Sequence, residues 1–246
     1  MVLYITKIVK NFFVLIWLIT FTFSGCRIQD YNIISDYNEN NISDAPIRSN
    51  ESLYYSKRII NLTPVCQYPE LPTGCEVTAL ATVLQYYGFS ADKCDLADNY
   101  LDKGAVGTVD FHTTFVGDPR SDYSYGCYAP AIVKAANKYL YEQDKELKAY
   151  DITGTDFEEL FSYTDKSIPV LVWCTIDLKP GHYTATWNID GKNITWYASE
   201  HCMVLLGQEG DHVYTADPTT GTIETYPKKL METRYKELFE QAVIIY

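Results

Sequence analysis

Residues 67–88, QYPELPTGCEVTALATVLQYYG, constrain the fold more than any other segment, because they join an extended approach to a long amphipathic pattern. Pro69 and Pro72 disfavour helical geometry in the residues before them, so the chain enters this segment extended. Apolar residues then recur at i, i+3, i+4 and i+7, which is the pattern of one buried helix face. They are Val77, Leu80, Ala81 and Leu84. The segment therefore predicts an amphipathic helix.

Cys75 falls in the first turn of this expected helix, off the centre of its buried face. Thr73 is the expected N-cap and Gly88 the expected stop. Free amides and the helix dipole stabilise a thiolate there, so we expect the pKa of Cys75 to lie well below its usual value of about 8.5. Gly74 is expected to leave room beside the sulfur for a substrate backbone. The position suits a nucleophile, and it equally suits a small buried cysteine that packs a helix start.

Residues 195–207, TWYASEHCMVLLG, have the character of a strand and contain one of the four histidines. Alternation along a strand gives it two apolar faces, one with His201, Met203 and Leu205 and the other with Cys202, Val204 and Leu206. Two apolar faces predict an inner strand. From the residues alone, a core histidine with a satisfied hydrogen bond is the default interpretation of His201.

The other histidines lie in less suitable places for a base. His112 and His182 fall in loop-like stretches, and His212 sits beside an expected turn. Cys202 points away from His201 and is not expected to join a site with it.

Asp217, followed by Pro218, closes the next strand-like run, DHVYTAD. An aspartate before proline is a common turn residue, and an acid in this place is also suited to orienting a histidine. Residues 208–210 are expected to form a three-residue hairpin loop, and in that register His201 pairs directly with Asp217 on one face of the sheet. A two-residue loop would turn Asp217 to the other face.

Six strings occur in an order and spacing that resemble a known family. They are LPTGCEVTALATVLQYYG at 71–88, FVGDP at 115–119, YGCYAP at 125–130, PVLVW at 169–173, EHCMVLLG at 200–207 and ADPTTG at 216–221. Together they resemble the bacteriocin-processing (double-glycine leader) peptidase-like family, a branch of the papain-like cysteine peptidases. The resemblance covers about residues 60–246.

This resemblance implies a papain-like α+β fold in which an N-terminal nucleophile helix packs on an antiparallel sheet. It implies Cys75 as the nucleophile, His201 as the base and Gln67 as a donor to the oxyanion. Asp217 is then the acid that orients His201. The transporter that accompanies the leader peptidases is not seen in this sequence, so cleavage of double-glycine leaders is not inferred.

The expected activity is hydrolysis of peptide or protein substrates through a thioester acyl-enzyme, with no cofactor and no metal. One alternative is a cell-wall amidase or endopeptidase that uses the same chemistry on peptidoglycan stem peptides, because fold and triad alone do not choose the substrate. Another is a non-catalytic surface pseudopeptidase that binds peptides.

The N-terminal segment predicts export. Lys7 and Lys10 precede the apolar run FFVLIWLITFTF, and Ser24, Gly25 and Cys26 follow it. The run has the length of a signal-peptide core and is short for a bilayer-spanning helix. The small residues before Cys26 resemble the lipobox of bacterial lipoproteins, so we expect Cys26 to carry a lipid. An uncleaved N-terminal anchor is the alternative, and both place the protein at a membrane outside the cytoplasm.

These observations divide the chain into three parts: a lipoprotein-type signal peptide at 1–25, a polar tether at 26–58 and a papain-like cysteine peptidase-like domain at 59–246. The formal net charge is −12 and no Lys/Arg cluster occurs, so a nucleic-acid partner is not expected. The domain's cysteines form no CxxC motif and no Cys/His cluster, so we expect mostly buried thiols and no structural metal. They are Cys66, Cys75, Cys94, Cys127, Cys174 and Cys202.

Overall fold

The computed structural model describes residues 59–143 and 146–246. The expected signal peptide, the expected lipidation site Cys26 and the expected tether therefore lie outside the described residues. Within the described ranges, none of the helices combines the length and the apolar character that crossing a bilayer requires.

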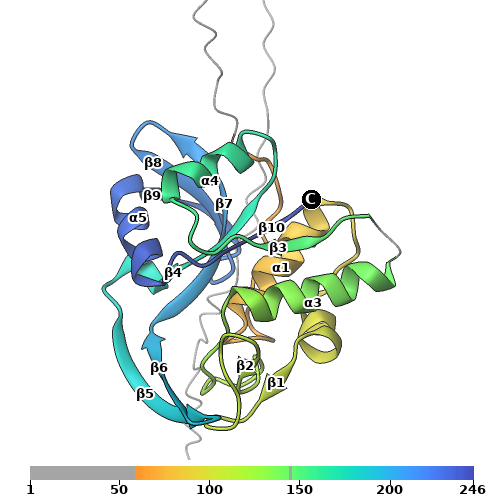
Figure 1. The fold of residues 1–246 in the computed structure, drawn as a ribbon. Coiled ribbons are helices and arrows are strands. Elements are labelled where there is room, and N and C mark those ends of the chain that lie inside the picture. The colour runs from red at the N-terminus through yellow and green to blue at the C-terminus, as the bar shows by residue number, and fades with distance from the viewer. Residues whose placement is uncertain (1–58, 144–145) are drawn as a thin grey trace, which may run out of the picture.

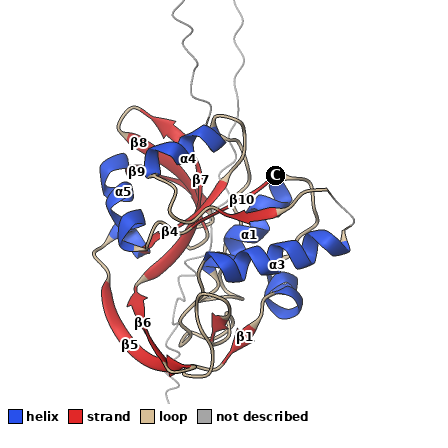
Figure 2. Cartoon of the chain, in the orientation of Figure 1, coloured by secondary structure: helices blue, strands red, loops and turns tan. Residues whose placement is uncertain are grey.

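A six-stranded antiparallel sheet forms the centre of the molecule (Figures 1 and 2). Its strand order is β3-β10-β4-β7-β8-β9. The strands are β3 (Ala149–Asp151), β4 (Val170–Thr175), β7 (Glu200–Glu209), β8 (His212–Asp217), β9 (Thr222–Pro227) and β10 (Ala242–Ile245). Strands β4 and β7 are buried along nearly their whole length, because both faces of the sheet are covered.

Helices cover the two faces of the sheet and form a hydrophobic core with each (Figure 1). The α1 core joins one face to α1 (Cys75–Tyr86) and α3 (Ala129–Glu142). The α5 core joins the other face to α4 (Phe157–Thr164) and α5 (Lys228–Glu237). The predicted α+β arrangement, with a helix that carries Cys75 packed on an antiparallel sheet, is confirmed.

A two-stranded hairpin extends from the sheet toward the lobe that contains α3 (Figure 2). It consists of β5 (His182–Ile189) and β6 (Lys192–Ala198). Trp187 anchors it by donating to the Val109 carbonyl at 2.9 Å, and Trp196 stacks on Tyr128. The remaining elements are α2 (Lys93–Asp95), a π-helical turn (Leu96–Tyr100), β1 (Lys103–Gly104), β2 (Phe115–Val116) and a 3₁₀ turn (Ile176–Leu178).

The start of α1 differs from the expectation by one residue. Gly74 is the N-cap, and the Thr73 hydroxyl instead donates to the Ser121 carbonyl at 2.9 Å. A Cβ added at Gly74 would lie 2.9 Å from the Leu71 Cβ, so the missing side chain makes room for packing rather than for substrate. The helix ends as predicted, with Gly88 at φ +87° just after it.

The face assignment of β7 is confirmed. Cys202, Val204 and Leu206 lie in the α1 core, whereas Met203 and Leu205 lie in the α5 core.

The predicted hairpin register is wrong. Glu209 pairs with His212, so the loop has two residues rather than three.

A two-residue loop by itself would turn the Asp217 side chain to the face opposite His201. A β-bulge in β7 cancels that change. The register shifts by one residue between Leu205 and Gly207, so Val204 pairs with Ala216. Because facing residues share one side of a sheet, Asp217 then lies on the same face as Met203 and His201. The bulge thus returns Asp217 to the histidine's side of the sheet.

The backbone geometry of this hairpin predicts that substitution by asparagine destabilises the protein at Gly207 and not at Gly210. Gly207 has φ +145°, a region open essentially to glycine alone, whereas Gly210 has φ +55°, which asparagine tolerates. We expect Gly207→Asn to lower the free energy of unfolding by about 1–3 kcal/mol. The matched Gly210→Asn should change it by no more than about 0.5 kcal/mol. Denaturant unfolding of both variants measures this, and equal losses would contradict the assignment of the bulge.

Candidate active site

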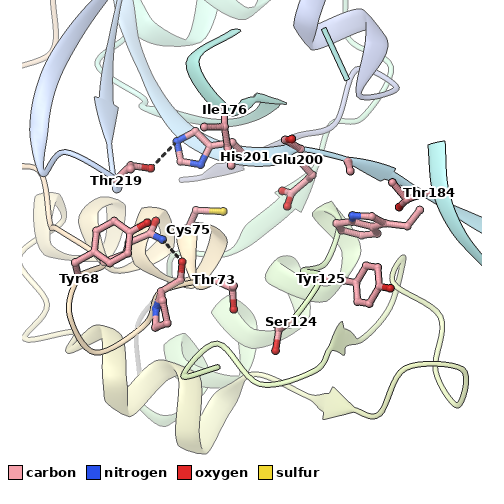
Figure 3. Close-up of a pocket in the computed structure, with 15 residues that line it drawn as sticks. Tyr68, Thr73, Cys75, Ser124, Tyr125, Ile176, Thr184, Glu200, His201 and Thr219 are labelled. Atoms are coloured by element: carbon pink, nitrogen blue, oxygen red, sulfur yellow. Dashed lines mark hydrogen bonds between the residues drawn. The ribbon is translucent and has the colours of Figure 1, made fainter. Parts of the chain in front are cut away.

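A cavity of about 380 Å³ opens between the start of α1 and the start of β7 (Figure 3). Residues from distant parts of the chain line it, including Gln67, Cys75, Trp196, Glu200, His201 and Thr219. Three of the four residues that the sequence analysis selected for catalysis therefore line one cavity. The fourth, Asp217, lies directly behind His201.

His201 and Asp217 form a buried hydrogen-bonded pair. Nε2 of His201 lies 2.8 Å from Oδ1 of Asp217, and the two residues are 3% and 5% exposed. The Thr219 backbone N–H donates to the same Oδ1 at 2.8 Å, and the Tyr226 hydroxyl donates to Oδ2 at 3.2 Å. Asp217 is therefore fixed from three sides, and it fixes the ring of His201 in turn.

These contacts decide the charge of Asp217. Burial alone raises its pKa, but the hydrogen bond and positive field of His201 and the bonds from Thr219 and Tyr226 outweigh burial. The pKa of Asp217 is lowered as a result. The acid is thus held as a carboxylate, the form that can orient an imidazole.

The choice of His201 among the four histidines agrees with its burial, because His112, His182 and His212 are all exposed. His112 is bound to Asp110 of its own loop, with Nδ1 and Oδ1 2.6 Å apart.

Cys75 is the first residue of α1 and is 7% exposed. Its sulfur lies 3.4 Å from Oε2 of Glu76, to which the thiol donates, and accepts from the Cys202 backbone N–H at 3.5 Å. The hydrogen bonds of the described residues link this sulfur to Glu76 and Cys202 and not to His201. Cys202 therefore joins the site through its backbone, although its side chain points away from His201 as predicted.

The expected lowering of the Cys75 pKa is wrong for this arrangement. Burial, followed by the nearby carboxyl groups of Glu76 and Glu200, raises the pKa of the Cys75 thiol well above its usual value. The Cys202 N–H opposes this shift but does not cancel it. In this position of the sulfur, the thiol is the favoured form.

Gln67 lies at the cavity, as its predicted role requires. Its Nε2 donates to the Pro72 carbonyl at 2.8 Å, which leaves the second hydrogen of the amide for another acceptor. Its backbone N–H donates to the Pro218 carbonyl at 2.8 Å, so the segment before α1 is tied to the loop after Asp217. Oε1 of Gln67 is buried and has no hydrogen-bond partner within the described parts of the chain.

Two buried acids at the site were missed by the sequence analysis. Oε1 of Glu76 accepts from the Cys127 backbone N–H at 2.7 Å. Burial raises the pKa of Glu76 to about 7, and burial together with Glu76 raises the pKa of Glu200 well above its usual value. The only local signal was their position, since each is the chain neighbour of a predicted catalytic residue.

Gly126 allows these two acids to approach one another. A Cβ added there would lie 2.6 Å from Oε1 of Glu76 and 2.9 Å from Oε2 of Glu200, so a larger residue would displace these carboxyl groups. The expectation of mostly buried thiols is also confirmed: of the six cysteines in the described residues, five are free and four of these are buried, while Cys66 is disulfide-bonded. The buried ones are Cys75, Cys127, Cys174 and Cys202, and Cys94 is half-buried.

Comparisons with known proteins agree with one another. The family model described as Peptidase_C39 like family matches residues 59–243. The uncharacterised protein YvpB of Bacillus subtilis (strain 168) is 30% identical over 183 residues, covering 72% of this chain and 70% of YvpB. A crystal structure from Bacillus anthracis, assigned by inference as a C39-like peptidase, matches with a TM-score of 0.68. It is 30% identical, and the match covers 76% of this chain and 96% of that one.

The buried aspartate predicts an acid-dependent contribution to stability. The folded pKa of Asp217 lies below its ordinary value of 3.8, so its contribution is present above that value and is lost as the pH falls through the folded pKa. We expect Asp217→Asn to lower the free energy of unfolding by about 2 kcal/mol at neutral pH, as for hydrogen bonds to a charged group. The gap to wild type should close in acid.

Denaturant unfolding at several pH values measures this gap. Asp190→Asn, at an exposed hairpin turn, is the control and should differ from wild type by no more than about 0.5 kcal/mol throughout. A gap for Asp217→Asn that stays constant as the pH falls would contradict the lowered pKa.

Proposed function

The chain belongs to the Peptidase C39-like family, and from this premise we propose that it is a cysteine peptidase that hydrolyses peptide bonds with Cys75 as nucleophile. The observation that carries the proposal is the His201–Asp217 pair, joined at 2.8 Å beside the cavity that Cys75 also lines. A candidate base with an oriented ring and a candidate nucleophile at a helix N-terminus thus meet at one cavity.

His201 is proposed as the base. Its Nε2 is engaged with Asp217, so Nδ1 is the nitrogen left to exchange a proton with the sulfur. Asp217 would hold this tautomer and stabilise the imidazolium that forms. The hydrogen bonds from Thr219 and Tyr226 keep the carboxylate charged while it does so.

The sulfur must leave its described contacts before it can react. It is bound to Glu76 and Cys202, where its pKa is raised. We propose that rotation about the Cα–Cβ bond of Cys75 carries it toward His201. There the proton passes to Nδ1, and the imidazolium stabilises the thiolate that remains.

The thiolate then attacks the carbonyl carbon of a peptide bond, and the carbonyl oxygen takes up the negative charge. The free amide hydrogen of Gln67 and the Cys75 backbone N–H are the proposed oxyanion donors, and loss of one such donor costs about 3 kcal/mol of barrier. The imidazolium protonates the leaving amine, which leaves a thioester on Cys75. A water that gives its proton to His201 hydrolyses the thioester and releases the second product.

This proposal predicts a loss of activity confined to the proposed triad. Cys75→Ala and His201→Ala should each lower kcat/KM on peptide substrates by a factor on the order of 10⁴–10⁶, while the fold is retained. Cys94→Ser is the control, because Cys94 is also a free thiol and is less buried. Cleavage of a peptide library, read by mass spectrometry, and labelling by a peptidyl epoxide measure the effect. Hydrolysis that survives in Cys75→Ala would contradict the assignment.

We also propose that the protein is a lipoprotein on the extracytoplasmic face of a bacterial membrane. The proposal is supported by the lysines, the apolar run and the small residues that precede Cys26 in the sequence.

Mass spectrometry of the membrane fraction should find an N-terminal Cys26 that carries a diacylglyceryl group. Cys26→Ser should prevent both lipidation and cleavage, so the signal segment should stay attached to the protein. Recovery of wild-type protein with Met1 intact would contradict lipidation.

A further inference from the structure

A second cluster of chemically active groups adjoins the catalytic pair. Cys75, Glu76 and Glu200 are all buried, and one ligand atom from each lies within 4.8 Å of the other two. In Figure 3 the Cys75 sulfur and the Glu200 side chain are turned toward one another, on the side away from Thr219. The proposed peptidase mechanism uses Cys75 and neither carboxyl group.

Glu200 carries a carboxyl oxygen that the described part of the chain leaves without a hydrogen bond. The residue is 7% exposed, and its Oε1 has no hydrogen-bond partner among residues 59–143 and 146–246. Leaving such a buried group unpaired costs about 1–3 kcal/mol. Glu76 brings a second buried carboxyl group to the same place, so a cation there would offset both desolvation and like-charge repulsion.

Backbone N–H groups position two of the three candidate ligands, Cys75 and Glu76. The Cys127 N–H binds Oε1 of Glu76 at 2.7 Å and leaves Oε2 facing the sulfur at 3.4 Å. On a tetrahedral zinc ion with Zn–S of about 2.3 Å and Zn–O of about 2.0–2.2 Å, sulfur and oxygen ligands stand about 3.6 Å apart. The present separation therefore already approaches that of two ligands on one ion.

We propose that Cys75, Glu76 and Glu200 bind a divalent transition-metal cation of the zinc class, through the thiolate and one oxygen of each carboxylate. The thiolate disfavours Mg²⁺ and Ca²⁺, which take oxygen ligands in larger numbers. Binding releases to solvent the thiol proton, together with any proton that the carboxyl groups of Glu76 and Glu200 carry. Because Cys75 and Glu200 line the cavity, the fourth position opens to it, where a water can complete the tetrahedron.

One consequence rests on the proposed function. The metal and the peptidase chemistry need the same sulfur, so a metal-bound Cys75 can neither pass a proton to His201 nor attack a carbonyl. The site therefore makes zinc a reversible inhibitor that holds the sulfur on the Glu76 side of the cavity, and a chelator restores activity.

Cobalt titration of the full-length protein tests the site without an activity assay, because cobalt–thiolate bonds give a charge-transfer band in the near ultraviolet. We expect this band to saturate at one Co²⁺ per chain and to vanish when Zn²⁺ displaces it. Cys75→Ser should remove the band. Glu200→Gln should weaken binding on the order of 10- to 100-fold. Cys94→Ser and Glu159→Gln, an exposed acid on α4, are matched controls and should bind as wild type.

A second measurement needs no variant. Zn²⁺ should slow the alkylation of Cys75 by iodoacetamide at least about tenfold, and a chelator should restore the rate. Peptide mapping measures the alkylation of Cys75. A band that persists in Cys75→Ser, unchanged affinity in Glu200→Gln, or unchanged alkylation overturns the site. Unchanged affinity in Glu200→Gln would place any metal between Cys75 and His201 instead.

The two proposals fail separately. A protein that cleaves peptides and gives no cobalt–thiolate band contradicts the metal site alone. A protein that gives the band and cleaves no peptide contradicts the proposed function alone.

Discussion

Strand β7 is buried on both faces between two hydrophobic cores, and its two-residue period decides which groups share the site. His201 faces the α5-core side, where Asp217 reaches it from β8. Its neighbour Cys202 faces the α1-core side, where its backbone N–H meets the Cys75 sulfur. Strand β7 thus carries the proposed base, His201, and its backbone N–H at Cys202 contacts the proposed nucleophile. This division depends on the bulge before Gly207, because without it Asp217 would lie on the opposite face.

Two electrostatic effects compete at Cys75, and their magnitudes explain the outcome. A helix N-terminus stabilises a negative charge by typically 0.3–1 kcal/mol and by at most about 2 kcal/mol. Full burial can shift a pKa by up to about 3–5 units, each worth about 1.4 kcal/mol, and Glu76 and Glu200 add like charge to it. Burial and like charge therefore win while the sulfur faces the acids. Contact with an imidazolium is the remaining way to stabilise the thiolate, which is why the side-chain rotation of Cys75 matters to the proposed mechanism.

Cys75 and His201 each have an acidic neighbour in the chain, Glu76 and Glu200. Cys75 and His201 belong to the proposed reaction, whereas Glu76 and Glu200 converge on the opposite side of the sulfur, beside Gly126. The sulfur stands between a base that would activate it and carboxyl groups that hold it protonated or, as proposed, bind it through a metal. The position of a single side chain thus links the peptidase proposal to its regulation.

The sequence by itself determined the local elements: the buried face of α1, the helix stop at Gly88, the two apolar faces of β7 and, through ordered motifs, the family. These features follow from periodicity and from strings of adjacent residues. Only the tertiary structure decided the N-cap at Gly74, the two-residue loop with its bulge, the Gln67–Pro72 contact, and the meeting of Glu76 with Glu200. It also reversed the expected pKa shift of Cys75. The physical reason is that desolvation and like-charge repulsion depend on distances between residues up to 127 positions apart, such as Cys75 and Cys202, which no local pattern encodes.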